Sequence, residues 1–320
     1  MRAREGWALG LAAVCAAGAF AAAMTLGLPG TTGGLAARIL WSVRLPEALT
    51  ALIVGGGLGL SGLLFQLVLR NPLADPYVLG VAGGSTFAAV AATLFLGTAA
   101  AGGGMALRGA AALVGGLLTL AGLMKLAGGK PETLLLGGVV ANTAFAAGAR
   151  MLTVWLSPEQ LAYVTTFLVG FIPTPPTAIP LLLGIPCLYT LARFMPRGRG
   201  LDLLLLSDDE ARATGLEVGR VRREALLLAT VLAAAAVTLC GMLGFVGLVV
   251  PHLARLTAGR RHRVLVPASF LLGAAFLLAA LTAGKLVGGS WLAPVGVYTS
   301  LVGAPVFLVL LVRSSRRELP

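Results

Sequence analysis

Charged residues are scarce in this chain. Only 11% of its 320 residues are Asp, Glu, Lys or Arg, whereas a soluble domain carries about 25%. Hydrophobic residues make up 58% of the chain, and the mean hydropathy is +0.95. The charges lie in short islands between apolar runs. The sequence therefore leaves no room for a sizeable soluble domain and predicts a single transmembrane domain over residues 1–320.

Acidic residues, cysteine and histidine are also few. The 12 Asp and Glu residues lie in loops or at the edges of apolar runs. A carrier driven by an ion gradient needs ion ligands inside the membrane, so this class of protein is disfavoured. The three cysteines are far apart and form no C-x-x-C motif, so neither a disulfide nor a metal site is expected.

Two catalytic functions are disfavoured because the motifs that they need are missing. His252 and His262 have no Asp, Ser or Cys catalytic motif around them, which disfavours an intramembrane enzyme. No G-x-x-x-x-G-K-[ST] phosphate-binding loop occurs. We therefore expect that this chain hydrolyses no ATP and holds no cofactor of its own.

Apolar runs long enough to cross the membrane are abundant. About 17–25 apolar residues span the hydrocarbon core, and such runs recur from end to end. The prediction is an all-α bundle of ten transmembrane helices, one of them short, near residues 7–28, 47–68, 77–98, 106–126, 133–156, 177–195, 224–245, 247–257, 264–284 and 294–312. The first run also resembles a signal peptide, but a retained span fits the charge distribution better.

Lys and Arg are distributed unequally between the predicted loops. With the N-terminus inside and ten alternating spans, 19 of the 24 basic residues lie on the cytoplasmic side. Cytoplasmic loops of membrane proteins carry this excess, so both termini are predicted to be cytoplasmic. The net charge of +12 then reflects topology, and nucleic-acid binding is not expected.

Residues 244–263 are the most informative segment. Small residues Gly244 and Gly247 precede Pro251 and His252, and a cationic cluster follows. We expect a helix break at Pro251–His252. Backbone freed by a break at membrane depth is tolerated only inside protein or beside a water-filled cavity, which indicates a transport protein. His252 is expected to brace the break, although it could also titrate.

The link between the second and third spans also lacks helical character. Pro72 and Pro76 forbid a continuous helix through residues 70–80. Asn71 and Asp75 can bond to the exposed backbone groups. An ordinary turn is the alternative interpretation.

Residues 207–223 predict a pair of short cytoplasmic helices. Ser207 and Glu210 form an S-x-x-E capping box, and Gly215 is placed to end the first helix in a left-handed turn. A rigid protrusion of this kind could transmit force from a partner, whereas the alternative is a solvated loop. The run Asp208–Asp209–Glu210 suits helix capping better than a metal site, because successive residues point in different directions.

Five motifs resemble the permease family of ABC importers for iron-siderophore complexes, haem and cobalamin. The resemblance covers nearly the whole chain in the family's order and rests on Arg44-Leu-Pro, Asn71-Pro-Leu-Ala-Asp-Pro with Leu79-Gly80-Val81, Gly244-Phe-Val-Gly-Leu-Val-Val-Pro-His252, His262-Arg263 with Pro267, and Pro294-Val-Gly-Val with Gly303-Ala-Pro-Val-Phe307. It implies a homodimer in the inner membrane of a prokaryote that transports by alternating access along the dimer interface. Two separate ATPase subunits, which bind ATP and Mg²⁺, and an extracytoplasmic solute-binding protein would be its partners.

The resemblance also assigns roles to particular residues. Residues 207–223 would be the ATPase-coupling segment, with contacts from Ser207, Glu210, Ala211, Thr214, Gly215 and Leu216. Arg44 matches a basic residue that docks the binding protein, and Lys285 lies near another; both could instead hold the membrane interface. Three departures weaken the residue-level match at the outer end: Glu47 where the family has Arg, Leu281 where it has Asp, and Leu292 where it has Glu.

Two polar residues in the fifth span are candidates for the transport pathway. Arg150 should face the bundle, a cavity or the outer interface, because a lipid-facing charge costs about 2.5–3.5 kcal/mol. Asn142 could face the same cavity or join helices. The sequence does not select among siderophore, haem and cobalamin, and a gradient-driven carrier of a small solute remains the alternative function.

Overall fold

The computed structural model describes residues 2–26, 34–96, 103–128, 130–288 and 294–315, and every regular element in these ranges is helical. The helices are α1 (Arg2–Thr25), α2 (Gly34–Ile39), the π-turn η1 (Leu40–Arg44), α3 (Leu45–Val68), α4 (Val81–Leu96), α5 (Gly103–Ala127), α6 (Pro131–Thr153), α7 (Pro158–Val169), α8 (Ala178–Phe194), α9 (Gly198–Leu203), α10 (Asp208–Ala213), α11 (Val218–Cys240), α12 (Val246–Ala258), α13 (His262–Gly288) and α14 (Val295–Ser315).

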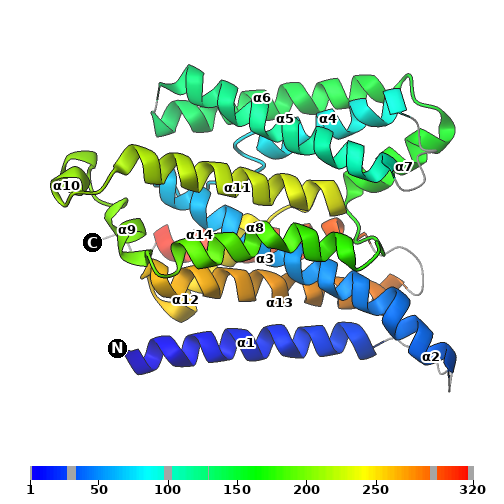
Figure 1. Cartoon of the computed structure of the whole chain (residues 1–320), viewed down its shortest axis with the longest axis horizontal. Helices are drawn as coiled ribbons and strands as arrows, with labels where there is room; N and C mark the ends of the chain where they lie inside the picture. The colour runs from blue at the N-terminus through cyan, green and yellow to red at the C-terminus, as the bar shows by residue number, and fades with distance from the viewer. Residues whose placement is uncertain (1, 27–33, 97–102, 129, 289–293, 316–320) are drawn as a thin grey trace.

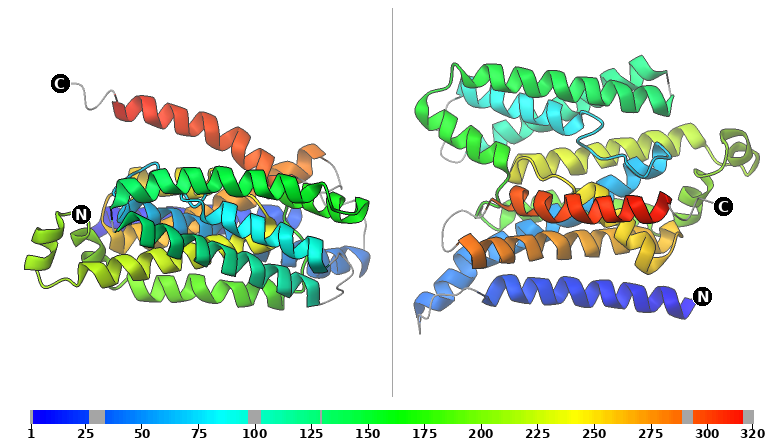
Figure 2. Two further views of the ribbon diagram at one scale, coloured as in Figure 1. Left: turned by 90° about the horizontal axis from the view of Figure 1, so that it is seen from above. Right: turned by 180° about the vertical axis from the view of Figure 1, so that it is seen from behind.

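The predicted polytopic bundle is confirmed. Within the described residues, six helices are long and apolar enough to cross a membrane, and four shorter apolar helices correspond to the remaining predicted spans. Helix α1 begins and α14 ends at the end of the bundle that carries α9 and α10 (Figure 1, Figure 2). We call this the coupling end and the opposite one the outer end.

Several predicted boundaries were wrong. The second span starts earlier, because α2 and η1 continue into α3 without interruption. The third starts later, at Val81, because the two prolines before it keep residues 71–80 irregular. Helix α7 was missed, although Ser157 and Gln160 form a capping box at its start and the S-x-x-Q pattern is visible in the sequence.

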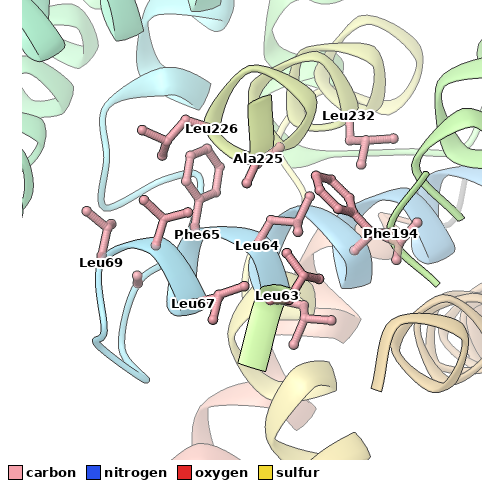
Figure 3. Packing of buried hydrophobic residues seen from close by; sticks show 14 of the residues in the cluster. Leu63, Leu64, Phe65, Leu67, Leu69, Phe194, Ala225, Leu226 and Leu232 are labelled. Carbon is pink, nitrogen blue, oxygen red and sulfur yellow. The ribbon is translucent and has the colours of Figure 1, made fainter. Parts of the chain in front are cut away.

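Helix α3 is the centre of the bundle. Of its 24 residues, 20 are buried, and it contacts α8, α11, α12 and α13. Phe65 and Leu64 lie between Leu226 of α11 and Phe194 of α8 (Figure 3). Helices α4, α5 and α6 form a second group beside α11, and α1 lies against α13 on the opposite side (Figure 1). A helix that is apolar all round suits this buried position.

Glycines allow α3 to approach its neighbours closely. A Cβ atom at Gly55 would lie 2.3 Å from the Gly273 carbonyl oxygen of α13, and one at Gly59 would lie 2.3 Å from the Ser269 oxygen. Small residues four apart promote such contacts in lipid, where no hydrophobic force drives helices together. Gly55 and Gly59 are four residues apart, and both lie at the α3–α13 contact.

The helix break lies earlier than predicted. Helix α11 ends at Cys240, and α12 begins at Val246 after Phe245, whose φ is 68°. Helix α12 then continues through Pro251, so the predicted break at Pro251–His252 was wrong. Proline removes the N–H that would bond to the carbonyl four residues earlier, and Gln66 Nε2 of α3 donates to that Gly247 oxygen at 3.2 Å and to the Leu248 oxygen at 3.4 Å.

Candidate functional site

The capping box predicted for the coupling segment is present. Ser207 Oγ accepts from the Glu210 N–H at 3.3 Å, and Glu210 Oε2 accepts from the Ser207 N–H at 3.0 Å. The Ser207 hydroxyl also donates to Glu210 Oε2 at 2.7 Å, and this hydrogen bond, followed by the one from the Ser207 N–H, lowers the pKa of the Glu210 carboxyl. Gly215, with φ of 83°, ends the turn after α10, and Thr214 donates to the Ala211 oxygen at 2.7 Å.

One part of the coupling prediction was wrong. No separate second short helix follows Gly215 in residues 207–223, because α11 starts at Val218 and continues into the membrane span. No proline interrupts residues 218–240, so nothing ends the helix there. The short pair at this end is instead α9 and α10. Ala211 of α10 is fully buried, and Leu216 packs against the main core.

Asp208 connects α10 to two long helices. Its Oδ1 lies 2.8 Å from Arg70 Nη2, after α3, and 2.9 Å from Arg222 Nη2 of α11. Hydrogen bonding from Arg222, followed by the contact with Arg70, lowers the pKa of the Asp208 carboxyl. Arg70 also donates to the Leu204 oxygen at 3.0 Å and to the Leu206 oxygen. The sequence interpretation missed this network, although the three charges stand out in islands.

A second polar contact fixes α9 at the same end. Asp202 Oδ1 accepts from the His262 N–H at 3.0 Å and lies 2.7 Å from His262 Nδ1, at the start of α13. Burial would raise the pKa of Asp202, but the bonds to His262 outweigh it and lower the pKa. Arg261 bonds Glu5 of α1 at 3.2 Å. These pairs join α1, α9 and α13 at the coupling end.

The 70–80 link packs against the break between α11 and α12. Asn71 Oδ1 accepts from the Leu73 N–H at 2.8 Å, and Asp75 Oδ1 accepts from the Tyr77 N–H at 3.3 Å, as the capping interpretation expected. The Tyr77 hydroxyl is hydrogen-bonded to the N–H of Leu243 in the break. The two irregular segments therefore support each other in the bundle interior.

The remaining residues of the break motif lie near this contact. A Cβ at Gly247 would meet Pro76 at 3.2 Å and Asp75 at 3.4 Å, and a Cβ at Gly244 would meet Ser300 of α14 at 3.3 Å. His252 does not brace a break, because α12 is helical on both sides of it; its side chain lines a cavity at the coupling end.

Arg44, Glu47 and Lys285 form a cluster at the outer end, which we call the outer cluster. Lys285 Nζ pairs with Glu47 Oε2, and these side chains are 16% and 14% exposed. Arg44 is 8% exposed and donates to the Ala23 oxygen at 3.5 Å. Glu47, the departure from the family's basic residue, therefore serves as the partner of Lys285. Docking through Arg44 and Lys285 stays a prediction.

The two other residues that depart from the family pattern, and the two candidates for the transport pathway, do not form a common site. Leu281 is buried within the apolar core, and Leu292 lies outside the described residues. Asn142 packs against Gly83 of α4, where an added Cβ would lie 2.4 Å from Asn142 Oδ1. Arg150, eight residues further along α6, is exposed near the outer end. The structure does not bring Asn142 and Arg150 together.

Comparisons with known proteins agree with this architecture. The model of the FecCD transport family matches residues 8–313. The chain is 36% identical over 300 residues to the cobalamin import system permease protein BtuC of Halobacterium salinarum, with 92% of this chain and 77% of the relative covered. It is 36% identical over 284 residues to the Fe(3+) dicitrate transport system permease protein FecD of Escherichia coli, with 86% and 85% covered.

A solved structure shares the fold. It is described as a metal-chelate type ABC transporter in an inward-facing conformation, and it superposes with a TM-score of 0.86 at 28% identity, covering 95% of this chain and 98% of the other. The family model, the relatives and this structure each extend over most of the chain. The chain is a multi-pass membrane permease that belongs to the FecCD transport family.

Proposed function

We propose that this chain is the permease subunit of an ATP-driven ABC importer for a metal chelate, haem or cobalamin. Its relatives include permeases named for cobalamin import, hemin transport and Fe(3+) dicitrate transport. Two copies of the chain would form the translocation pathway along their interface. A solute-binding protein would deliver the substrate to the outer end.

The observation that carries this proposal is the fixed position of α10. A segment that transmits force must be rigid and joined to the helices it moves. The capping box orders α10, and Asp208 ties it to the end of α3 and the start of α11. Two ATPase subunits, which bind ATP and Mg²⁺, would press on residues 207–216 and switch the dimer between inward-facing and outward-facing states.

The basic residues at the coupling end also support an orientation of the chain in the membrane. Basic residues are concentrated around α9, α10 and the end of α12, which lie at the coupling end. An excess of Lys and Arg marks the cytoplasmic side of a membrane protein. Both termini would therefore be cytoplasmic in the inner membrane. The outer cluster would lie at the extracytoplasmic surface, where the binding protein docks.

Coupling can be tested by changing the backbone of the turn after α10. Gly215 and Gly128 both have positive φ, 83° and 55°, and a Cβ would meet no atom within 4 Å at either. Proline requires φ near −65°, so Gly215→Pro should distort the coupling segment. Gly128→Pro applies the same change to the link between α5 and α6 and serves as the matched control.

The first measurement is whether the ATPase encoded beside this chain is retained during purification. The second is ATP-dependent uptake of a chelate into proteoliposomes. Wild type and Gly128→Pro should retain the ATPase, and Gly215→Pro should lose most of it. A wild-type protein that purifies stably without any ATPase in mild detergent would contradict the importer assignment. Uptake driven by an ion gradient in its place would favour the secondary-carrier alternative.

A further inference from the structure

A cavity of about 430 Å³ opens at the coupling end, where α3, α12 and α13 meet beside α14. Part of its lining consists of arginine and histidine side chains, from Arg70, His252, Arg255, Arg260 and His262. Among the residues that the structure describes, no acidic residue belongs to the lining. The proposed transport function uses α10 and the α11–α12 break, so it leaves this cavity unexplained.

The positive charge in the cavity is only partly neutralised. Arg70 is paired with Asp208, and His262 is paired with Asp202. Arg255 and Arg260 form no salt bridge to any acidic residue in the part of the chain that the structure describes. Two like charges facing one half-enclosed space repel each other, so an anion placed between them would stabilise the arrangement.

The remaining lining is mostly apolar, with the amide side chains of Gln66 and Asn71 beside it. Leu67, Leu73, Leu205, Leu265 and Phe307 come from α3, the links after α3 and α9, and helices α13 and α14. Small water-soluble anions gain nothing from such a surface. An amphipathic molecule does, because its anionic head can contact the arginines while its hydrocarbon covers the leucines and Phe307.

The position of the cavity narrows the choice further. Helix α3 ends at Val68 and α12 at Ala258, so the cavity lies where apolar spans give way to the basic end of the bundle. Basic pockets between transmembrane helices on the cytoplasmic side bind acidic lipid head groups. We propose that His252, Arg255 and Arg260 bind the phosphate of an anionic phospholipid whose acyl chain packs against Leu265 and Phe307.

The proposal is tested by lipid retention. The purified protein is exchanged into detergent with phosphatidylglycerol or phosphatidylcholine, and bound lipid is counted by native mass spectrometry. Each basic residue near an anionic lipid contributes enough affinity that Arg255→Gln with Arg260→Gln should weaken phosphatidylglycerol retention about thirtyfold. Arg255→Lys with Arg260→Lys keeps the charge and should retain most of the lipid.

The matched control is Arg220→Gln with Arg223→Gln. It removes the same charge from the exposed start of α11, outside the cavity, and should leave retention unchanged. If the Arg255→Gln with Arg260→Gln variant does not fold, melting temperatures provide the test. Wild type should then melt at a higher temperature in phosphatidylglycerol than in phosphatidylcholine. The variant Arg255→Lys with Arg260→Lys should keep most of this difference.

Three results would overturn the proposal. Equal retention of the two lipids by wild type would exclude head-group recognition. Equal loss in the Arg220 and Arg223 control would reduce the effect to net charge. Displacement of the lipid by millimolar inorganic phosphate would assign the cavity to a free anion, and its displacement by a second copy of the chain would assign the cavity to a protein contact. The assay needs neither ATPase nor cargo, so its failure would leave the importer proposal intact.

Discussion

The pairing of Gln66 with Pro251 makes a prediction that a double-mutant cycle can test. Gln66 is 3% exposed, and its Nε2 donates to the carbonyl oxygens of Gly247 and Leu248. Pro251 cannot supply the N–H that Gly247 would otherwise receive. Gln66→Met keeps the volume and removes the donor, so it leaves the Gly247 carbonyl without a partner in the bundle interior.

The expected magnitude follows from these contacts. A buried polar group left without a partner costs about 1–3 kcal/mol. The Oε1 atom of Gln66 has no hydrogen-bond partner in the described part of the structure, so its removal offsets some of that cost. We expect Gln66→Met to lower the free energy of unfolding by about 1.5 kcal/mol. Pro251→Ala restores a backbone donor, so the same change in that background should cost about 0.5 kcal/mol.

The assay is equilibrium unfolding in mixed micelles, followed by tryptophan fluorescence, for the two single variants and the double variant. A coupling energy of about 1 kcal/mol is expected between Gln66 and Pro251. Pro267→Ala, near the start of α13, is the control and should be additive with Gln66→Met. If Gln66→Met and Pro251→Ala are additive as well, Gln66 does not compensate for the proline, and the reasoning is refuted.

Three further predictions concern packing and charge. Gly62→Ala should lower the free energy of unfolding by about 3 kcal/mol, because the added Cβ would lie 1.9 Å from the Gly247 oxygen. Gly122→Ala is the control: its Cβ would meet no atom within 4 Å, so it should raise the free energy of unfolding by up to about 1 kcal/mol. Equal effects of the two substitutions would contradict the close contact at Gly62. Lys285→Met should destabilise by about 3 kcal/mol because it removes the ammonium partner of the buried Glu47 carboxylate, and the double variant Lys285→Met with Glu47→Leu should recover most of that loss; no recovery would show that the pair is not the cause. Because the pKa of Asp208 is lowered in the folded protein, its stabilisation is present above the ordinary aspartate pKa and is lost as the pH falls through the lowered value; Asp208→Asn should flatten the acid limb of the unfolding curve, and an unchanged curve would exclude this role.

Local features of the fold were predictable because they depend on neighbouring residues. The apolar runs predicted ten spans, and the Ser207–Glu210 capping box was recognised from four residues and is present. Asn71 was expected to bond to nearby backbone, and it does. The same kind of local signal at Ser157–Gln160 was overlooked, which is why α7 was missed.

The position of the helix break could not be predicted from the sequence, because a distant residue decides it. Pro251 suggested a break by its own chemistry, but Gln66, 181 residues earlier than Gly247, supplies the missing donor and lets α12 continue. Left-handed residues Gly241 and Phe245 make the break instead. Phenylalanine is not a residue that marks such a conformation in a sequence.

The sequence by itself determined the class of protein, the number of spans, the distribution of charge between the two ends and the capped helix α10, since hydropathy and capping act over a few residues. Only the tertiary structure decided which charges meet. Arg70 pairs with Asp208 across 138 residues and Lys285 with Glu47 across 238. In a bundle, partners of this kind are chosen by which helix faces approach closely, and that depends on the packing of all the helices together.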